Sequence, residues 1–424
     1  MKRLPIFALI LSLMAAPLCA VETKKASVKW PSWRGPHFNG VADGDQFPTK
    51  WSAREHVKWA ATLPGKGAST PVVVDEKILL THGEGGTNHV SCFSLASGEK
   101  LWSTQVGSER SGKHQKATGA NPSIVTDGEH AWAYFKSGDL ACLDLAGKVV
   151  WQANLQEKYG KDTLWWDLGT SPVLTKDCVV VAVMHSGPSF LAAFDKKSGD
   201  EVWKTERNMD APSEAAQSYS TPMLVNDGAQ DLLVTVGADA VTAHDAVKGN
   251  EVWRVIGLNP SQNGFFRSIS SVVAADGVVI APYARGNSLT AIKLGGKGDV
   301  SKSHVLWQLT EDGSGADVPT PIAKDGKVYV FHDGRDKSLE CLDLKTGKKL
   351  WNVATPKHRS SVSASPIMAG DRFYVAREDG TVFVIKDGKI EAENPLDGEM
   401  LVATPVLVDG KILLRTVSKL YCIE

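Results

Sequence analysis

The sequence has none of the short signatures that mark common catalytic and metal centres. It contains no Cys-Cys pair, no Cys-x-x-Cys or Cys-x-x-Cys-His, no Gly-x-Ser-x-Gly, no His-Glu-x-x-His and no phosphate-cradling glycine loop. A thiol redox centre, a covalently attached c-type haem and the common hydrolase and metalloprotease sites are therefore not expected.

An excess of charge of one sign is also missing. The chain has 47 Lys and Arg against 48 Asp and Glu, a formal net charge of −1. Because the two signs are nearly equal, the chain has no excess of basic residues that would attract nucleic acid or an anionic membrane surface. We therefore expect no nucleic-acid partner and no insertion into a membrane.

The start of the chain reads as a signal for export. An apolar run at Ile6–Met14 is too short to span a bilayer, and a basic start and a small-residue end flank it, so residues 1–20 are predicted to be a secretory signal peptide. Pro17-Leu18 before Cys19 does not match a lipobox. We expect a soluble periplasmic or extracellular product.

From Pro71 onward the chain is built of repeats. The stretch 321–351 reads as four short strands, with tight turns at Asp325-Gly326 and Thr346-Gly347. The proline that opens the first strand recurs about every 48 residues, usually after Ser or Thr. Val272 fills the one gap, and the prolines are Pro71, Pro122, Pro172, Pro222, Pro321, Pro366 and Pro405. This spacing is typical of the four-stranded blades of a β-propeller.

The two ends of the chain complete one blade. The last repeat supplies only three strands before the chain stops, whereas Val57–Thr62 has the pattern of an outer strand with no blade before it. We predict an all-β fold, an eight-bladed β-propeller of four-stranded antiparallel blades closed by this N-terminal strand. The propeller is one domain, residues 57–424. Residues 21–56 have no periodicity and are predicted to be an extended arm that contributes no strand to the ring.

Tryptophan and cysteine recur at fixed places in the repeats. A Trp stands four residues after a turn glycine in five repeats, as in Gly199/Trp203, and we interpret these rings as packing between blades. Four cysteines share one place on the third strand: Cys92, Cys142, Cys341 and Cys422. Equivalent positions in neighbouring blades lie beyond the roughly 7 Å limit for a disulfide, so these and Cys178 are predicted to be buried and unpaired.

The run Leu342–Trp351, LDLKTGKKLW, resembles the tryptophan-docking repeat of the pyrroloquinoline quinone (PQQ) type eight-bladed propellers. That family includes quinoprotein alcohol dehydrogenases and the propeller subunit of the outer-membrane protein assembly machinery. The resemblance covers about residues 57–424 and implies the fold, but not an activity, because the family holds both enzymes and binding scaffolds. Trp33-Arg34-Gly35-Pro36 also resembles the start of many uncharacterised secreted propellers of this kind.

Long connections before each inner strand should gather on one face of the disc, here called the loop face, and the tight turns on the other. Loops between the second and third strands add His82, His185, Arg285, His332 and Arg377 to the loop face. The predicted ligand-binding residues of the central funnel are Lys113, His114, Trp165, Trp166, Asp167, Gln217, Tyr219, Phe266, Arg267, Asp317, His358 and Arg359. The basic residues in this region suit an anionic ligand, and its aromatic rings suit a flat one.

Two functions remain open from the sequence. The first is an exported, non-catalytic and monomeric binding or scaffold protein, which takes a protein, a peptide or a small anion on its loop face. The second is a divergent PQQ-dependent oxidoreductase of alcohols or sugars, whose cofactor sits over Ca²⁺ held by carboxylate and amide oxygens. Asp167, Asp317 and Asn121 are of the right type for such a site, but nothing clusters them in the sequence. We favour the first reading, with no catalytic residue, no metal and no cofactor.

Overall fold

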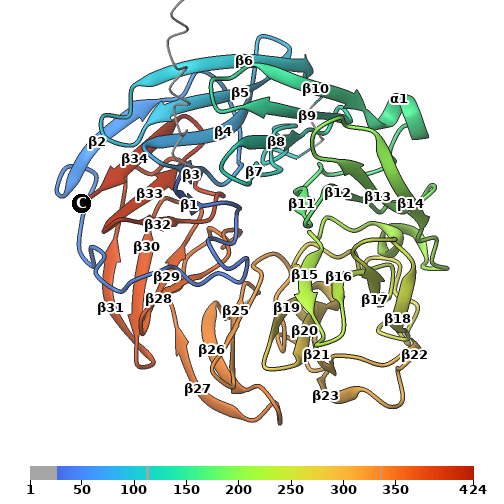
Figure 1. Cartoon of the computed structure of the whole chain (residues 1–424). Coiled ribbons are helices and arrows are strands. Elements are labelled where there is room, and N and C mark those ends of the chain that lie inside the picture. Colours follow the sequence, from blue (N-terminus) through green and yellow to red (C-terminus); the bar gives the residue numbers. More distant parts are fainter. Residues whose placement is uncertain (1–25, 111–113, 335) are drawn as a thin grey trace, which may run out of the picture.

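The computed structural model describes residues 26–110, 114–334 and 336–424. They form eight antiparallel blades in a ring (Figure 1), as predicted. The signal peptide lies outside the described residues and stays a prediction. Within the described ranges, no helix has the length and apolar character needed to cross a membrane.

Each blade runs from an inner strand at the channel to an outer strand at the rim. The first four blades comprise, in chain order, β3 (Val72–Val74), β4 (Lys77–Glu84), β5 (Thr87–Ser94) and β6 (Lys100–Ser108); β7 (Val125–Thr126), β8 (His130–Tyr134), β9 (Asp139–Asp144) and β10 (Val149–Asn154); β11 (Val173–Leu174), β12 (Cys178–Val183), β13 (Phe190–Asp195) and β14 (Glu201–Glu206); β15 (Met223–Asn226), β16 (Asp231–Gly237), β17 (Ala240–Asp245) and β18 (Glu251–Val255). The fourth blade has an added edge strand, β22 (Gly298–Asp299), which pairs in parallel with β18.

The remaining blades repeat this plan. They comprise β19 (Val273–Ala275), β20 (Val278–Tyr283), β21 (Ser288–Lys293) and β23 (Val305–Leu309); β24 (Ile322–Lys324), β25 (Lys327–His332), β26 (Ser338–Asp343) and β27 (Lys349–Ala354); β28 (Ile367–Ala369), β29 (Arg372–Ala376), β30 (Val382–Lys386) and β31 (Lys389–Asn394); β32 (Val406–Val408), β33 (Lys411–Arg415) and β34 (Lys419–Ile423). Short helices lie in the connections: α1 (Leu155–Tyr159), η1 (Ser213–Ala216) and η2 (Ala284–Gly286).

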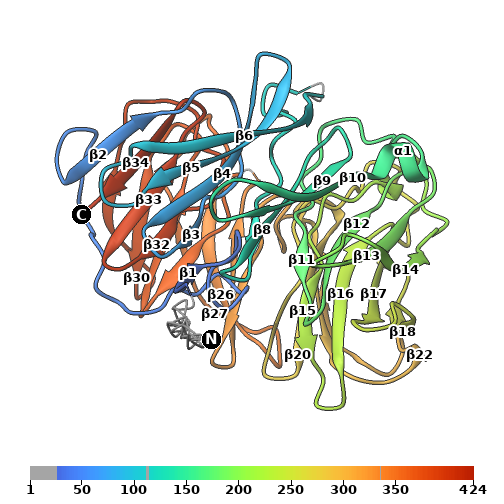
Figure 2. The same cartoon turned by 45° about the horizontal axis from the view of Figure 1, so that its top comes forward.

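The N-terminal strand closes the ring, which confirms the prediction. β2 (Val57–Thr62) pairs antiparallel with β34 over its whole length, and both views show the two strands side by side (Figures 1 and 2). The indole N–H of Trp59 then donates to the carbonyl of Leu95 in the first blade, at 3.1 Å. The first and last parts of the chain are thereby fastened together, and the sheet edge of the last blade is covered.

The outer-strand tryptophans pack as predicted. Most of these rings lie against the turn glycine of the next blade. A Cβ added to Gly199 would stand 2.6 Å from the Trp151 ring, and one added to Gly98 would stand 2.5 Å from the Trp59 ring. Both glycines also have a positive φ, 77° and 73°. The Trp253 ring is fully buried in a core cluster instead. The five cysteines of the described chain are buried and free, which confirms that prediction too.

Eight hydroxyl groups link the blades around the channel. In each link the backbone N–H of one Ser or Thr donates to the side-chain oxygen of its counterpart in the next blade, at 2.9–3.3 Å. We call these residues the hydroxyl ring: Thr70, Ser123, Ser171, Thr221, Ser271, Thr320, Ser365 and Thr404. The link from Thr404 to Thr70 is a second closure of the ring, independent of β2. In the second blade the shared position is Ser123, which follows Pro122 instead of preceding it.

The prediction that the arm contributes no strand is wrong. Val28–Trp30 forms β1, which pairs with the inner strand β3, and the Trp30 side chain is fully buried. Farther along, the buried guanidinium of Arg34 donates to the carbonyls of Pro321 and Pro366, which directly precede the inner strands of two neighbouring blades. A segment without periodicity is held here because the backbone carbonyls of the channel satisfy its polar groups.

Candidate functional site

A cavity of about 1570 Å³ occupies the centre of the loop face. All eight members of the hydroxyl ring line it, and Trp33 reaches it from the arm. The Arg34 contacts fix the neighbouring arm backbone, and the Arg34 guanidinium lies 5.4 Å from the Trp33 ring centre. No periodicity in residues 21–56 indicates that an arm residue lines this cavity.

The structure brings together six of the predicted site residues. The residues on the cavity wall are His114, Trp166, Asp167, Tyr219, Arg267 and Asp317. Trp165 and Gln217 are neighbours of these residues in the chain but are not on the wall. Gln217 is buried and accepts a hydrogen bond from the Tyr219 hydroxyl at 2.8 Å. Phe266 packs edge-on to Tyr283 in the core between blades.

Two other predicted residues do not reach this cavity. His358 and Arg359 are exposed and absent from its wall, and His358 lies 3.6 Å from the Asp379 carboxylate. Lys113 lies outside the described residues. Of the second set of loop residues, Arg285 and the largely buried His332 line the cavity, whereas His82, His185 and Arg377 are buried and do not. Burial lowers the pKa of His82 to about 3, so this imidazole is a neutral core group.

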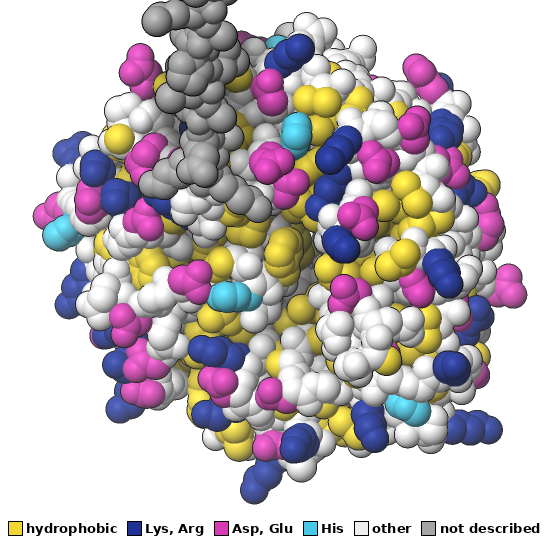
Figure 3. Space-filling view, viewed as in Figure 1, with side chains coloured by type: hydrophobic (Ala, Val, Ile, Leu, Met, Phe, Trp, Pro, Cys, Tyr) yellow, Lys and Arg dark blue, Asp and Glu magenta, His cyan; other side chains and the backbone are white. Residues whose placement is uncertain are grey.

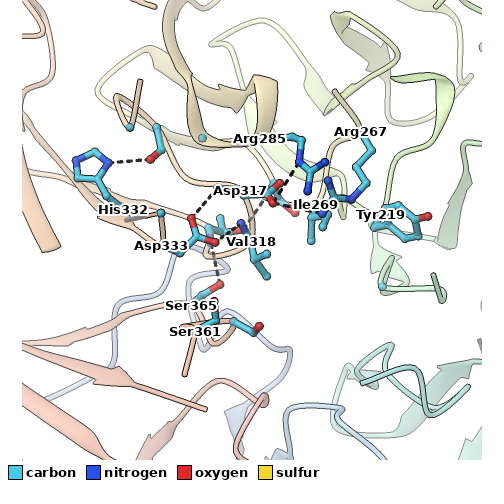
Figure 4. A pocket seen from close by; sticks show the side chains of 18 of the residues that line it. Tyr219, Arg267, Ile269, Arg285, Asp317, Val318, His332, Asp333, Ser361 and Ser365 are labelled. Carbon is cyan, nitrogen blue, oxygen red and sulfur yellow. Dashed lines mark hydrogen bonds and ion pairs between the residues drawn. The ribbon is translucent and has the colours of Figure 1, made fainter. Parts of the chain in front are cut away.

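The centre of the cavity wall is an ion-pair cluster (Figure 4). The Arg267 and Arg285 guanidinium groups lie 3.3 Å and 4.0 Å from the same Asp317 oxygen, and Arg267 also lies 3.4 Å from the Glu214 carboxylate. Arg285 and Ala284 both have a φ of 55°, in the left-handed region that side chains avoid. The strained turn positions Arg285 beside Asp317.

Two carboxyl groups of the wall are held by backbone N–H groups. Asp333 accepts from the N–H groups of Asp317 and Val318 at 2.8 Å and 3.1 Å, and Asp167 accepts from those of Leu168 and Gly119 at 2.7 Å and 3.3 Å. Burial raises the pKa of Asp333 to about 6 and that of Asp167 to about 7, although the N–H groups act in the opposite direction.

The lining is acidic rather than basic. Seven carboxylates line the cavity: Asp167, Glu311, Asp312, Asp317, Asp333, Asp336 and Glu340. Four Lys and Arg side chains do so: Lys116, Arg267, Arg285 and Lys349. All four lie within 4.0 Å of a carboxylate, so the basic character seen in the loop sequences is neutralised in the fold. On the opposite face, Figure 3 shows acidic and basic side chains intermixed.

The side chains of the cavity do not fit the Ca²⁺ that accompanies PQQ in the family's dehydrogenases. Calcium takes six to eight oxygen ligands, but Asp317 faces two guanidinium groups and both oxygens of Asp333 accept backbone N–H groups. Across the described residues, no group of three His, Cys, Asp or Glu side chains has a metal-binding arrangement. No catalytic step is assigned to this cavity.

Comparison with known proteins agrees with the fold. The chain is 23% identical over 369 residues to the outer membrane protein assembly factor BamB of Burkholderia pseudomallei (strain K96243). This alignment covers 84% of each chain. Among solved structures it resembles BamB from Moraxella catarrhalis, with a TM-score of 0.60, 16% identity, and coverage of 86% of this chain and 98% of that one. It also resembles a europium-containing methanol dehydrogenase, with a TM-score of 0.67, 12% identity, and coverage of 94% and 91%.

At such low identity, the structural likeness shows a shared fold and leaves the activity open. The sequence match to a family is more specific. The model described as outer membrane protein assembly factor BamB matches residues 49–217, 169–300 and 297–424, which together span the whole propeller. The chain therefore belongs to the family of the outer membrane protein assembly factor BamB.

Proposed function

We propose that this protein is a non-catalytic scaffold of outer-membrane protein assembly, which binds another protein through its loop face. The observation that carries this proposal is the family match over the whole propeller, residues 49–424. The shape of the molecule supports it, because a rigid closed ring presents anchored loops around a wide cavity. The protein acts in the periplasm, as a monomer, and without a nucleic-acid partner.

We further propose that it works without a bound cofactor. The paired carboxylates of the cavity, described above, support this reading, and so does the lack of any Cys-Cys pair in the sequence. A small anion is the less favoured ligand, because the four basic side chains of the wall already have carboxylate partners.

Deletion of the gene in the source organism tests the proposed role in outer-membrane protein assembly. The amount of correctly folded outer-membrane protein should fall, and the full-length gene should restore it. Unchanged outer-membrane proteins in the deletion strain would contradict the proposal. In parallel, the purified protein is mixed with PQQ and Ca²⁺, and reduction of an artificial electron acceptor by an alcohol or a sugar is followed. Saturable quenching of tryptophan fluorescence with turnover would instead establish the oxidoreductase.

A further inference from the structure

Exposed aromatic side chains gather at one place on the loop face. Among the described residues, four Trp and Phe side chains are exposed, and three of them lie on two loops: Trp165 (56%), Trp166 (41%) and Phe265 (67%). The fourth, Phe38, belongs to the arm. An exposed aromatic group next to a cavity is typical of a surface that binds a partner. We call Trp165, Trp166 and Phe265 the aromatic patch.

Fixed contacts join the two loops of the aromatic patch. The indole N–H of Trp166 donates to the Glu214 carboxylate at 2.7 Å, and that carboxylate also pairs with Arg267, two residues after Phe265. The N–H of Ala215 donates to the carbonyl of Gly264 at 3.0 Å. Helix η1 therefore ties the loops together, and the rings are presented on an ordered surface, which lowers the entropy lost on binding.

Acidic groups line the same cavity as Trp166 of the aromatic patch. The Arg267–Asp317 ion pair and the bond from the Ser270 N–H to the Asp317 carbonyl, 3.1 Å, connect the Phe265 loop to the loop of residues 310–320. That loop carries Glu311 and Asp312, which are exposed, line the cavity and form no ion pair with any described residue. A ligand that extends from the aromatic patch along the cavity wall to these residues therefore meets unpaired negative charge.

We propose that the aromatic patch binds an extended segment of a partner protein in which Lys or Arg alternates with aromatic or large aliphatic residues. The apolar side chains pack on Trp166 and Phe265. The basic side chains face Glu311 and Asp312 and interact with the exposed rings by cation–π attraction. This inference rests on the proposed function, because it specifies the chemistry of the protein that the loop face binds.

Binding is tested with a fluorescein-labelled short peptide in which lysine alternates with phenylalanine. In one control peptide glutamate replaces lysine, and in another serine replaces phenylalanine. Fluorescence anisotropy with the full mature protein should show saturable binding of the first peptide, and binding at least ten-fold weaker for each control. Stronger binding of the glutamate peptide would overturn the charge assignment, and absence of binding to all three would overturn the proposal.

Variants locate the site. Phe265→Ala with Trp166→Ala should weaken binding of the lysine–phenylalanine peptide at least ten-fold, and Glu311→Gln with Asp312→Asn should weaken it and reduce its salt dependence. Phe38→Ala is the matched control, since it removes an exposed ring away from the loop face and should leave affinity unchanged. Equal loss in all three proteins would place the site elsewhere. If the aromatic-patch variant binds no peptide yet restores the deletion strain, this inference fails while the proposed function stands.

Discussion

Glycine at the outer turn is required by the tryptophan of the preceding blade. Gly199→Ala adds a Cβ 2.6 Å from the Trp151 ring and keeps a φ of 77°, so it should lower the free energy of unfolding by about 2–4 kcal/mol. Gly277→Ala is the control, since φ is 74° there but no atom lies within 4 Å of the new Cβ. It should cost about 1–2 kcal/mol in urea unfolding. Equal losses would mean that the ring does not dock on the glycine.

The buried carboxyl of Asp167 should make stability depend on pH. Its pKa is raised from 3.8 to about 7, so the folded state holds a proton that the unfolded state has lost. The stabilisation by this group is complete below about pH 4 and is lost as the pH rises toward 7. The difference in unfolding free energy between the native protein and Asp167→Asn should therefore shrink or reverse by about 2–4 kcal/mol between pH 4.5 and pH 8. A difference independent of pH would show that Asp167 is ionised throughout.

The burial of single residues could be predicted from the sequence where the residue recurs at a fixed position of the repeat. The cysteines and tryptophans belong to repeats, so their burial followed from their place in a strand. The cavity residues did not follow in this way. Whether Arg267 is a free cation depends on Glu214 and Asp317, which the loops bring to it from 53 and 50 residues away in the sequence.

At the scale of strands, the hydroxyl ring is expected to contribute to the joining of blades. Thr221→Val keeps the shape of the side chain but leaves the buried N–H of Ser171 without an acceptor. This should lower the free energy of unfolding by about 1–3 kcal/mol. Thr310→Val, at an exposed position of the same cavity, should change it by less than about 0.5 kcal/mol. Chemical denaturation compares the two, and a Thr221 variant as stable as the native protein would show that the ring is dispensable.

The N-terminal strand should be indispensable for closure. Removal of residues 21–65 deletes β2, opens the edge of β34 and takes away the Trp59 contact with the first blade. The truncated protein should melt well below the native chain and aggregate, because an open edge pairs with other chains. Thermal unfolding with light scattering measures both effects. A monomer with the native melting temperature would mean that β2 does not close the ring.

A shorter truncation, of residues 21–45, keeps β2 but removes β1 and the Arg34 hydrogen bonds. The aperiodic sequence predicted that this arm contributes no strand, but the structure buries Trp30 completely and bonds Arg34 to the carbonyls of the prolines that precede two inner strands. Removal of residues 21–45 should therefore also destabilise the protein, by at least 3 kcal/mol from the loss of the buried Trp30 ring. Single substitution of Trp30 by Ala separates this packing from the rest of the arm. Periodicity finds strands that repeat, and β1 does not.

At the scale of the whole molecule, the sequence was sufficient for the ring and insufficient for its cavity. Eight blades follow from spacing, turns and chain ends, because each blade obeys the same local rules. The cavity combines loops from different blades with the arm, and none of these contacts has a local signal. The Ser or Thr before most inner-strand prolines was visible as a repeat, and it was the one sign of the hydroxyl ring.

We propose that the loop face of this closed ring binds a protein of outer-membrane assembly. The most direct measurement places a photo-crosslinking amino acid at position 265 or at position 38 of the full-length protein in living cells, followed by mass spectrometry of the products. We expect a crosslink to a component of the outer-membrane assembly machinery from position 265 and none from position 38. No crosslink from position 265, or the same products from both positions, would contradict this proposal.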